Sequence, residues 1–206
     1  MTAHRRFAKS VAFFDVDTQR DFMVPRGALY VPGARMVSKN IRRLVAYAAA
    51  RGLRLFASTD AHVPGDSEMR RFPPHCMLGT AGQSKIAGTL LPDHAVVPFG
   101  PRLAPAAIAR ALEHQQIVIQ KQSYDVFDNP STVPLLRAAG VRRFVVFGVA
   151  TDYCVRAAVL GLRANGYQVN VVTDAIRGIE PGATAAALEE MQRAGARFVQ
   201  TDSVLG

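Results

Sequence analysis

Short apolar runs that alternate with amphipathic stretches of helical spacing constrain the fold of this chain more than any other feature of its sequence. The apolar runs carry Val, Ile and Phe on both faces, which is typical of parallel strands that are covered on both sides by helices. Between them, apolar residues such as Ile41, Leu44 and Ala48 recur at helical spacing. Strands are therefore expected at 11–16, 53–58, 117–119, 144–149, 169–173 and 198–199, and helices at 34–51, 104–114, 129–139, 153–165 and 181–194.

Two segments between these elements carry specific expectations. Residues 60–100 hold many Pro and Gly residues with little periodicity, which indicates a long loop with short elements. Long loops inside compact domains are usually functional. Asn129 and Pro130 are expected to be the N-cap and the first residue of the helix that ends at Ala139.

Length, composition and charge favour one globular domain over other classes of protein. The 206 residues fit a single domain, 1–206, and 49% of them are hydrophobic, which is enough for a sizeable core. The formal net charge of +9 is scattered along the chain without a nucleic-acid-binding motif, so nucleic-acid binding is the weaker hypothesis. No apolar run reaches the roughly 18 residues that a membrane span needs. The basic residues 1–10 are followed by VAFFDVD, whose carboxylates exclude a signal-peptide core, so we expect a cytoplasmic protein.

Residues with reactive side chains follow four of the predicted strands. They are Asp17, Asp60 together with His62, Lys121, and Cys154 a few positions beyond its strand. In an open parallel sheet, ligands gather at the carboxyl ends of the strands. Each of these residues taken alone has an ordinary structural explanation, but their convergence at one edge of one sheet predicts a reactive site.

Cys154 is the residue in this set that can act as a nucleophile. It is expected to open a helix, whose N-terminus favours a thiolate, and Lys121 adds a positive charge. Asp17 is placed to accept the thiol proton and return it to a leaving amine. Backbone N–H groups of Ala150 and Cys154 are candidates for an oxyanion hole. The other cysteine, Cys76, is assigned to packing, since two cysteines make no disulfide framework.

Five segments in this order resemble the motifs of the isochorismatase-like superfamily, and of its nicotinamidases in particular. They are FFDVDTQRDFM (13–23), STDAH (58–62), FPPHCMLGTAG (72–82), Lys121 and GVATDYCV (148–155). The resemblance implies a three-layer α/β/α sandwich with a six-stranded parallel sheet of Rossmann-like topology. It implies Asp17 as the base, Lys121 as its electrostatic partner and Cys154 as the nucleophile. It also implies a cis peptide between Val149 and Ala150.

The resemblance further implies a divalent metal ion. Asp60 and His62 lie two residues apart, so on an extended backbone their side chains point the same way. With His75 they would form a set of one carboxylate and two imidazoles that leaves positions open for water or substrate. Glu68 matches a position where some relatives have a further ligand. Zinc is the expected metal, and iron and manganese fit the same ligand types.

Residues that would bind the substrate are also carried over from the resemblance. Phe22 and Phe72 correspond to aromatic positions on either side of the substrate ring, although position 72 is commonly Trp in the family. The segment after Lys121 departs from the family pattern, and there Tyr124 and Phe127 are expected to supply the aromatic lining. Val149, which precedes Ala150, and Tyr153, which precedes Cys154, complete the predicted binding residues.

The expected function is hydrolysis of nicotinamide to nicotinate and ammonia through a thioester on Cys154. One alternative is another amidase of the superfamily that acts on carbamoyl or ureido compounds. A non-enzyme alternative is a catalytically silent binding module or a basic nucleic-acid binder. The expected partners are a small amide substrate and further copies of the chain, because relatives are often dimers or tetramers.

Overall fold

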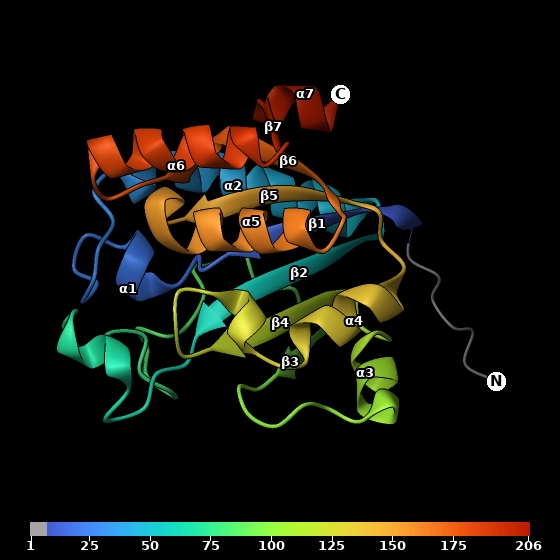
Figure 1. Cartoon of the computed structure of the whole chain (residues 1–206), viewed down its shortest axis with the longest axis horizontal. Coiled ribbons are helices and arrows are strands. Elements are labelled where there is room, and N and C mark those ends of the chain that lie inside the picture. The colour runs from blue at the N-terminus through green and yellow to red at the C-terminus, as the bar shows by residue number, and fades with distance from the viewer. Residues whose placement is uncertain (1–7) are drawn as a thin grey trace.

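The computed structural model describes residues 8–206 and contains one parallel sheet (Figure 1). The sheet has seven strands in the order β3-β4-β2-β1-β5-β6-β7, and every neighbouring pair is parallel. All six predicted strands are present, and β3 is an additional strand at one edge. The strands are β1 (Ala8–Val16), β2 (Leu53–Asp60), β3 (His94–Val97), β4 (Gln116–Lys121), β5 (Arg143–Val149), β6 (Gln168–Arg177) and β7 (Arg197–Val199).

Helices cover both faces of this sheet and make the predicted α/β/α arrangement (Figure 1). One face is packed by α3 (Pro105–Ala111), α4 (Thr132–Ala139), α5 (Arg156–Ala164) and α6 (Pro181–Arg193). The opposite face is packed by α1 (Arg20–Met23), α2 (Ala34–Ala50) and α7 (Thr201–Leu205). Three further turns are the 3-10 helices Ser67–Arg70 and Val126–Asp128 and the π-helix Thr151–Val155.

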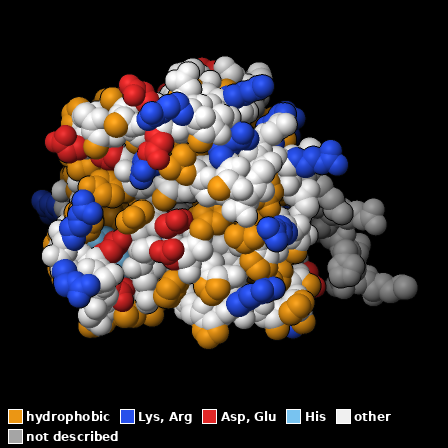
Figure 2. Space-filling view, viewed as in Figure 1, with side chains coloured by type: hydrophobic (Ala, Val, Ile, Leu, Met, Phe, Trp, Pro, Cys, Tyr) orange, Lys and Arg blue, Asp and Glu red, His pale blue; other side chains and the backbone are white. Residues whose placement is uncertain are grey.

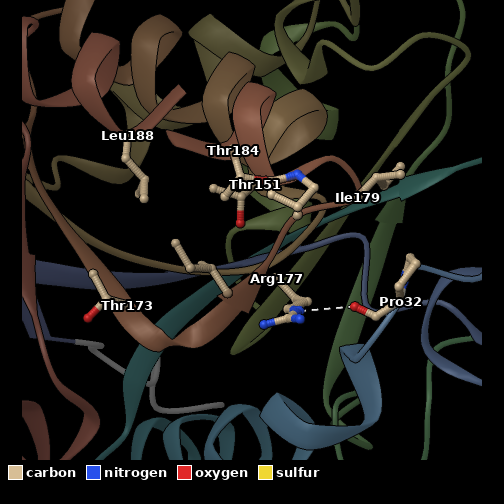
Figure 3. Close-up of a pocket in the computed structure, with 10 residues that line it drawn as sticks. Pro32, Thr151, Thr173, Arg177, Ile179, Thr184 and Leu188 are labelled. Atoms are coloured by element: carbon tan, nitrogen blue, oxygen red, sulfur yellow. Dashed lines mark hydrogen bonds between the residues drawn. The ribbon is translucent and has the colours of Figure 1, made fainter. Parts of the chain in front are cut away.

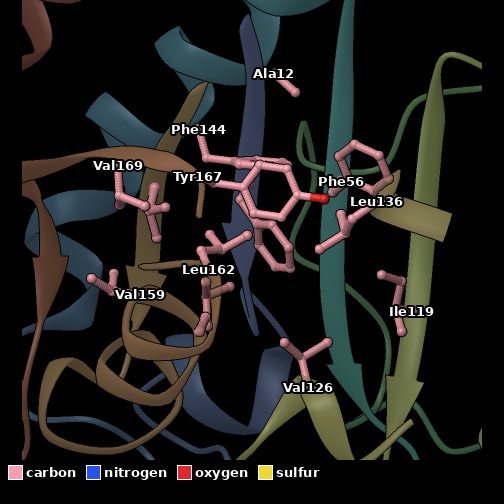
Figure 4. Close-up of a cluster of buried hydrophobic side chains, with 14 of the residues drawn as sticks. Ala12, Phe56, Ile119, Val126, Leu136, Phe144, Val159, Leu162, Tyr167 and Val169 are labelled. Carbon is pink, nitrogen blue, oxygen red and sulfur yellow. The ribbon is translucent and has the colours of Figure 1, made fainter. Parts of the chain in front are cut away.

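Alternate side chains of each central strand supply two separate hydrophobic cores. Phe14 of β1 and Phe144 of β5 lie in the core beneath α3 to α6, with their ring centroids 6.1 Å apart. Figure 4 shows Phe144 in this core together with Phe56 and Tyr167. Phe13, the preceding residue of β1, lies in the other core against α2. Burial on both faces explains why the sequences of these strands are continuously apolar and do not alternate between apolar and polar residues. Because both faces are filled, the functional side chains are confined to the carboxyl edge of the sheet.

Three local expectations differ from the structure. The edge strand β3 was not predicted, because four residues inside a Pro- and Gly-rich segment are too short to show a period. The helix α4 begins at Thr132 rather than at Pro130, with Ser131 as its N-cap residue, because Asn129 Oδ1 accepts the Ser131 N–H at 2.9 Å in a turn that precedes the helix. Cys154 lies in the π-helical turn that precedes α5 and not in the first turn of an α-helix.

A glycine allows β1 and β5 to come together next to the reactive residues. Gly148 has a φ of +125°, and a Cβ atom there would lie 2.0 Å from the carbonyl oxygen of Val16. Any side chain would therefore force the two strand ends apart. The cis peptide implied by the resemblance follows directly, between Val149 and Ala150.

The surface charge and the helices concern two classes of partner, nucleic acids and membranes. On the face shown in Figure 2, Lys and Arg side chains are interspersed with acidic and hydrophobic ones. None of the helices within residues 8–206 combines the length and apolar character needed to cross a bilayer. Most of the basic N-terminal segment on which the signal-peptide argument rests, residues 1–7, lies outside the described residues.

Candidate active site

Asp17, Lys121 and Cys154 come together at the carboxyl edge of the sheet, as the sequence predicts. The Lys121 ammonium lies 2.8 Å from Asp17 Oδ2 and 3.7 Å from Cys154 Sγ. It also contacts Asp60 and donates to the carbonyl of Ser123 at 3.0 Å. The Asp17 carboxylate interacts with the Cys154 thiol and contributes to its raised pKa. Three segments distant in the sequence thus place a carboxylate, an amine and a thiol in direct contact.

The backbone at Asp17 aims its carboxylate into this cluster. Asp17 follows the last residue of β1 and has a φ of +47°, a left-handed conformation that is uncommon for a residue other than Gly. The Ser58 hydroxyl donates to Asp17 Oδ1 at 2.7 Å, and the Asp17 N–H donates to the Ser58 carbonyl at 3.2 Å. These two bonds from β2 hold the strained residue, and strain of this kind commonly occurs at functional sites.

Burial and charge set the protonation of the cluster. Burial raises the pKa of Asp17 above its ordinary value, and the nearby Lys121 charge offsets this only in part. Burial likewise raises the pKa of the Cys154 thiol well above its ordinary value. For Lys121, burial alone would lower the pKa, but the carboxylates of Asp17 and Asp60 raise it well above the ordinary value. The resting site therefore holds a charged amine, a protonated thiol and a carboxylate with enhanced affinity for a proton.

The segment that carries Cys154 also contains the two residues predicted to form an oxyanion hole, Ala150 and Cys154. The π-helical turn Thr151–Val155 follows the cis peptide, and its Cys154 side chain is buried. Ala150 and Cys154 both line the same cavity. Asp152, on the same turn, accepts N–H bonds from Ile179 and Glu180 at 2.9 to 3.1 Å, which fixes the turn to the loop before α6.

Asp60, His62 and His75 form a buried group whose ligand atoms all lie within 4.8 Å of one another. Asp60 Oδ2 is 3.6 Å from His62 Nε2 and 3.8 Å from His75 Nε2. Glu68 Oε2 lies 3.6 Å and 4.0 Å from the same two nitrogens, so a second carboxylate faces the group. Two ligand atoms on a tetrahedral zinc ion are about 3.4 Å apart, so these separations suit one shared ion with little adjustment.

The hydrogen bonds around this group also fit a metal site. His75 Nδ1 bonds the Pro73 carbonyl at 2.8 Å, which leaves the lone pair on Nε2. His62 Nδ1 bonds Asp66 at 2.9 Å, and His62 Nε2 has no hydrogen-bond partner among the described residues. Imidazoles that ligate metals are usually oriented by such a bond on their other nitrogen. The four side chains therefore fit a divalent cation.

Gln19 and Asp21 position this group, although the sequence argument assigned them no role. Gln19 bonds both the N–H and the carbonyl of Asp60, at 2.7 and 2.8 Å. Asp21 accepts the N–H of Cys76, the residue after His75, at 2.7 Å. A Cβ at Gly82 would lie 2.1 Å from the Asp21 carboxylate, so only Gly fits there. Both residues lie in the segment FFDVDTQRDFM (13–23), and their place in that motif is the only feature of the sequence that indicates a role for them.

A narrow cavity of about 30 Å³ joins the reactive cluster to the metal-ligand group. Predicted binding residues that line it are Phe22, Phe72, Tyr124 and Tyr153, of which Tyr124 is 46% exposed. Leu29, Val31 and Ile179 also line it and were missed, because apolar loop residues carry no sequence signal of function.

Two predicted binding residues lie elsewhere. Phe127 packs against α5, where a Cβ at Gly161 would lie 2.2 Å from its ring. Val149 is fully buried in the core beneath α2. The structure therefore brings neither side chain to the cavity. Cys76 is also buried outside the cavity lining, which agrees with its assignment to packing.

Comparisons with known proteins agree with this geometry. The family model described as Isochorismatase domain matches residues 11–203. The nicotinamidase of Escherichia coli (strain K12) is 34% identical over 197 residues, covering 88% of this chain and 90% of that protein. The nicotinamidase/pyrazinamidase of Mycobacterium tuberculosis (strain ATCC 25618 / H37Rv) is 31% identical over 197 residues, covering 91% and 97%.

A solved structure of another protein has a similar fold. The crystal structure of the pyrazinamidase of Pyrococcus horikoshii in complex with zinc resembles this fold with a TM-score of 0.77 and 30% sequence identity. The similarity covers 93% of this chain and 99% of that one. The matched range of the family model includes all the residues of the cluster and the metal-ligand group.

Proposed function

This chain belongs to the isochorismatase family, and from that premise we propose that it hydrolyses nicotinamide to nicotinate and ammonia. The coarser assignment, an amidase of this family, is supported by the two relatives at 31–34% identity. The observation that carries the finer proposal is the contact of Asp17 and Lys121 with Cys154, which lines a cavity with aromatic walls.

The reaction begins with transfer of the thiol proton. Asp17, whose pKa is raised by burial, accepts the proton of Cys154 while the Lys121 charge stabilises the thiolate. The sulfur then attacks the carboxamide carbon, and a C–S bond forms. Negative charge develops on the carboxamide oxygen, next to the N–H groups of Ala150 and Cys154.

Collapse of this intermediate releases ammonia. The C–N bond breaks while Asp17 returns its proton to the departing nitrogen, which leaves a thioester on Cys154. A water molecule then gives a proton to Asp17 and attacks the thioester carbon. The C–S bond breaks, the acid product forms, and the proton on Asp17 passes back to the sulfur.

The cavity walls and the metal-ligand group account for substrate choice. Phe22, Phe72 and Tyr153 present aromatic surface to a flat ring, and the narrow space between them favours a small one. Asp60, His62, His75 and Glu68 would hold a divalent ion, which supplies a Lewis acid that orients the ring nitrogen of the substrate. We propose zinc, because the similar pyrazinamidase of Pyrococcus horikoshii was solved with zinc.

An ammonia-release screen tests the proposal directly. Purified protein is assayed with nicotinamide, pyrazinamide and N-carbamoyl amino acids, and its metal content is measured on the same sample. We expect turnover of the two ring amides by the metal-containing protein. Hydrolysis of carbamoyl compounds alone would contradict the nicotinamide assignment but not the amidase assignment.

A matched pair of cysteine variants tests the nucleophile. Cys154→Ala should abolish ammonia release and leave the melting temperature close to that of the wild type. Cys76→Ala removes the other buried thiol, which does not line the cavity, and should retain turnover. Turnover by Cys154→Ala would overturn the thioester mechanism.

A further inference from the structure

A second cavity lies beside the active site, at the carboxyl end of β6 (Figure 3). Its volume of about 380 Å³ falls within the range of small-molecule sites. It is bounded by the end of β6, the loop before α6, α6 itself and the turn that carries Cys154. Only Ile179 lines both this cavity and the narrow one that holds Cys154. We call it the β6 cavity.

Two threonines, Thr151 and Thr184, lie in the wall of this space. Thr151 is 1% exposed and its Oγ1 is buried, so this residue packs in the wall and its hydroxyl is not within reach of a ligand there. Thr184 Oγ1 lines the same space, where a Cβ at Gly178 would lie 1.9 Å from it.

An arginine lies on the opposite side of the β6 cavity from these hydroxyls (Figure 3). Arg177 Nε donates to the Pro32 carbonyl at 3.0 Å, which fixes the side chain and leaves its terminal nitrogens for other acceptors. Within the described part of the chain, no carboxylate is in ion-pair range of Arg177. A planar guanidinium held in place suits two-pronged binding of a carboxylate.

The remaining walls of the β6 cavity are apolar. Ile176, Ile179, Pro181 and Leu188 supply them. A ligand that matches these walls therefore has one carboxylate for Arg177 and an apolar body of about ring size. Small aromatic carboxylic acids, the class to which the product of aromatic amide hydrolysis belongs, have this form.

The floor of the β6 cavity is connected to the reactive turn by hydrogen bonds. Asp152, two residues before Cys154, accepts the N–H groups of Ile179 and Glu180 at the entry to α6. Thr151 is part of that turn as well. A ligand that packs against Thr151 and Ile179 therefore acts on the segment that carries the thiol.

We propose that the β6 cavity is a second binding site, for a small aromatic carboxylate, and that its occupation lowers turnover at Cys154. The effect on turnover rests on the proposed amidase function, whereas the binding site does not.

Calorimetric titration with benzoate tests the binding site without any use of turnover. The titration uses the full chain with Cys154→Met, whose longer side chain fills the narrow active cavity. We expect benzoate to bind this protein, and Arg177→Met in the same background to weaken binding at least tenfold. Benzyl alcohol, which lacks the charge, should bind weakly to both. Arg110→Met, at an exposed position of α3 that lines neither cavity, is the matched control and should bind like its parent.

Kinetics of the enzyme with an intact Cys154 test the coupling. Benzoate should lower kcat at saturating nicotinamide, and Arg177→Met should remove that decrease. Absence of benzoate binding, or binding unchanged by Arg177→Met, overturns the site. Binding that alters KM alone overturns the coupling to Cys154. If no amide is hydrolysed, the proposed function fails, and the titration still decides the site.

Discussion

Two buried lysine–aspartate pairs lie at the end of β1, and only one of them belongs to the reactive cluster. Lys85 Nζ is 2.9 Å from Asp15 Oδ2, and Lys121 Nζ is 2.8 Å from Asp17 Oδ2. The two lysine side chains are 3% and 0% exposed. Burial raises the pKa of both aspartates. By charge, distance and burial the pairs are almost equivalent.

Their surroundings are different. Asp17 and Lys121 contact a thiol at the edge of a cavity. Lys85 instead donates to the Thr18 hydroxyl at 2.8 Å, and the same hydroxyl bonds Asp15 at 3.1 Å, so this pair contacts a hydroxyl in place of a thiol. A buried ion pair is therefore not a sign of catalysis by itself. The pair at Asp15 ties the loop that follows residue 80 to the strand, while the pair at Asp17 can move a proton.

The same substitution in the two aspartates should separate these roles most strongly. Asp17→Asn removes the group that accepts the thiol proton, so kcat for nicotinamide should fall by about 10²–10⁴-fold. Asp15→Asn keeps a polar partner for Lys85 and Thr18, and its kcat should stay within a few-fold of the wild type. Steady-state ammonia release measures both. Equal losses in the two variants would show that the pairs are not functionally distinct.

Substitution of Lys85 tests how much its pair with Asp15 contributes to the free energy of unfolding. Lys85→Met leaves Asp15 buried without its cation, and removal of one partner of a buried pair costs about 3–5 kcal/mol. The pKa of Asp15 is already raised by burial, so the folded state binds a proton more readily than the unfolded state. Stability contributed by this group is present at low pH and is lost as pH rises through the folded pKa.

The loss in Lys85→Met should therefore be larger at pH 7 than at acidic pH, because protonation removes the uncompensated charge of Asp15. Urea unfolding at both pH values measures it. The double variant Asp15→Leu/Lys85→Met is the control, because apolar replacement of a whole buried pair is often neutral. A loss independent of pH would mean that Asp15 is not the group responsible.

Much of the cluster could be predicted because its residues sit at strand ends. The apolar runs that end at Val16, Ile119 and Val149 identified the carboxyl edge of the sheet, and the reactive residues follow them directly. Each strand is marked by the composition of a short local segment, and the edge rule needs no knowledge of which strands are neighbours. This is why Asp17, Lys121 and Cys154 could be grouped before any contact was known.

Features that depend on pairing across the chain could not be predicted in this way. Nothing local to Asp15 indicates Lys85, seventy residues later in a loop without periodicity. Leu29 and Ile179 reach the cavity from irregular segments, where apolar character is ordinarily read as core. The π-helical turn at Cys154 has the same apolar pattern as an α-helix. In the segment after Lys121, Tyr124 lines the cavity as predicted, whereas Phe127 does not.

Two histidine–aspartate contacts allow the same kind of test at the metal-ligand group. His62 Nδ1 bonds Asp66 inside the group, and His114 Nδ1 bonds Asp93 at the surface, both at 2.9 Å. Asp66→Asn should weaken zinc binding about 10–100-fold, as loss of a carboxylate behind a ligating histidine typically does. Asp93→Asn should not change zinc affinity. Competition with a chromophoric chelator measures both, and equal affinities in the two variants would contradict the assignment of His62 as a ligand.

Substitution of two phenylalanines, Phe72 and Phe127, is expected to have the smallest effects, and the two effects should differ in kind. Phe72 lines the active cavity with its ring 5.8 Å from that of Tyr153, whereas Phe127 packs on α5 away from it. Aromatic pairs contribute about 0.5–1.5 kcal/mol beyond area burial, so Phe72→Leu should raise KM for nicotinamide about 2–10-fold. Phe127→Leu should lower the melting temperature and leave KM unchanged, because its ring fills a hydrophobic core. If KM rose in Phe127→Leu alone, the substrate would be bound on the α5 side of the sheet edge, and the cavity at Cys154 would not be the site of ring recognition.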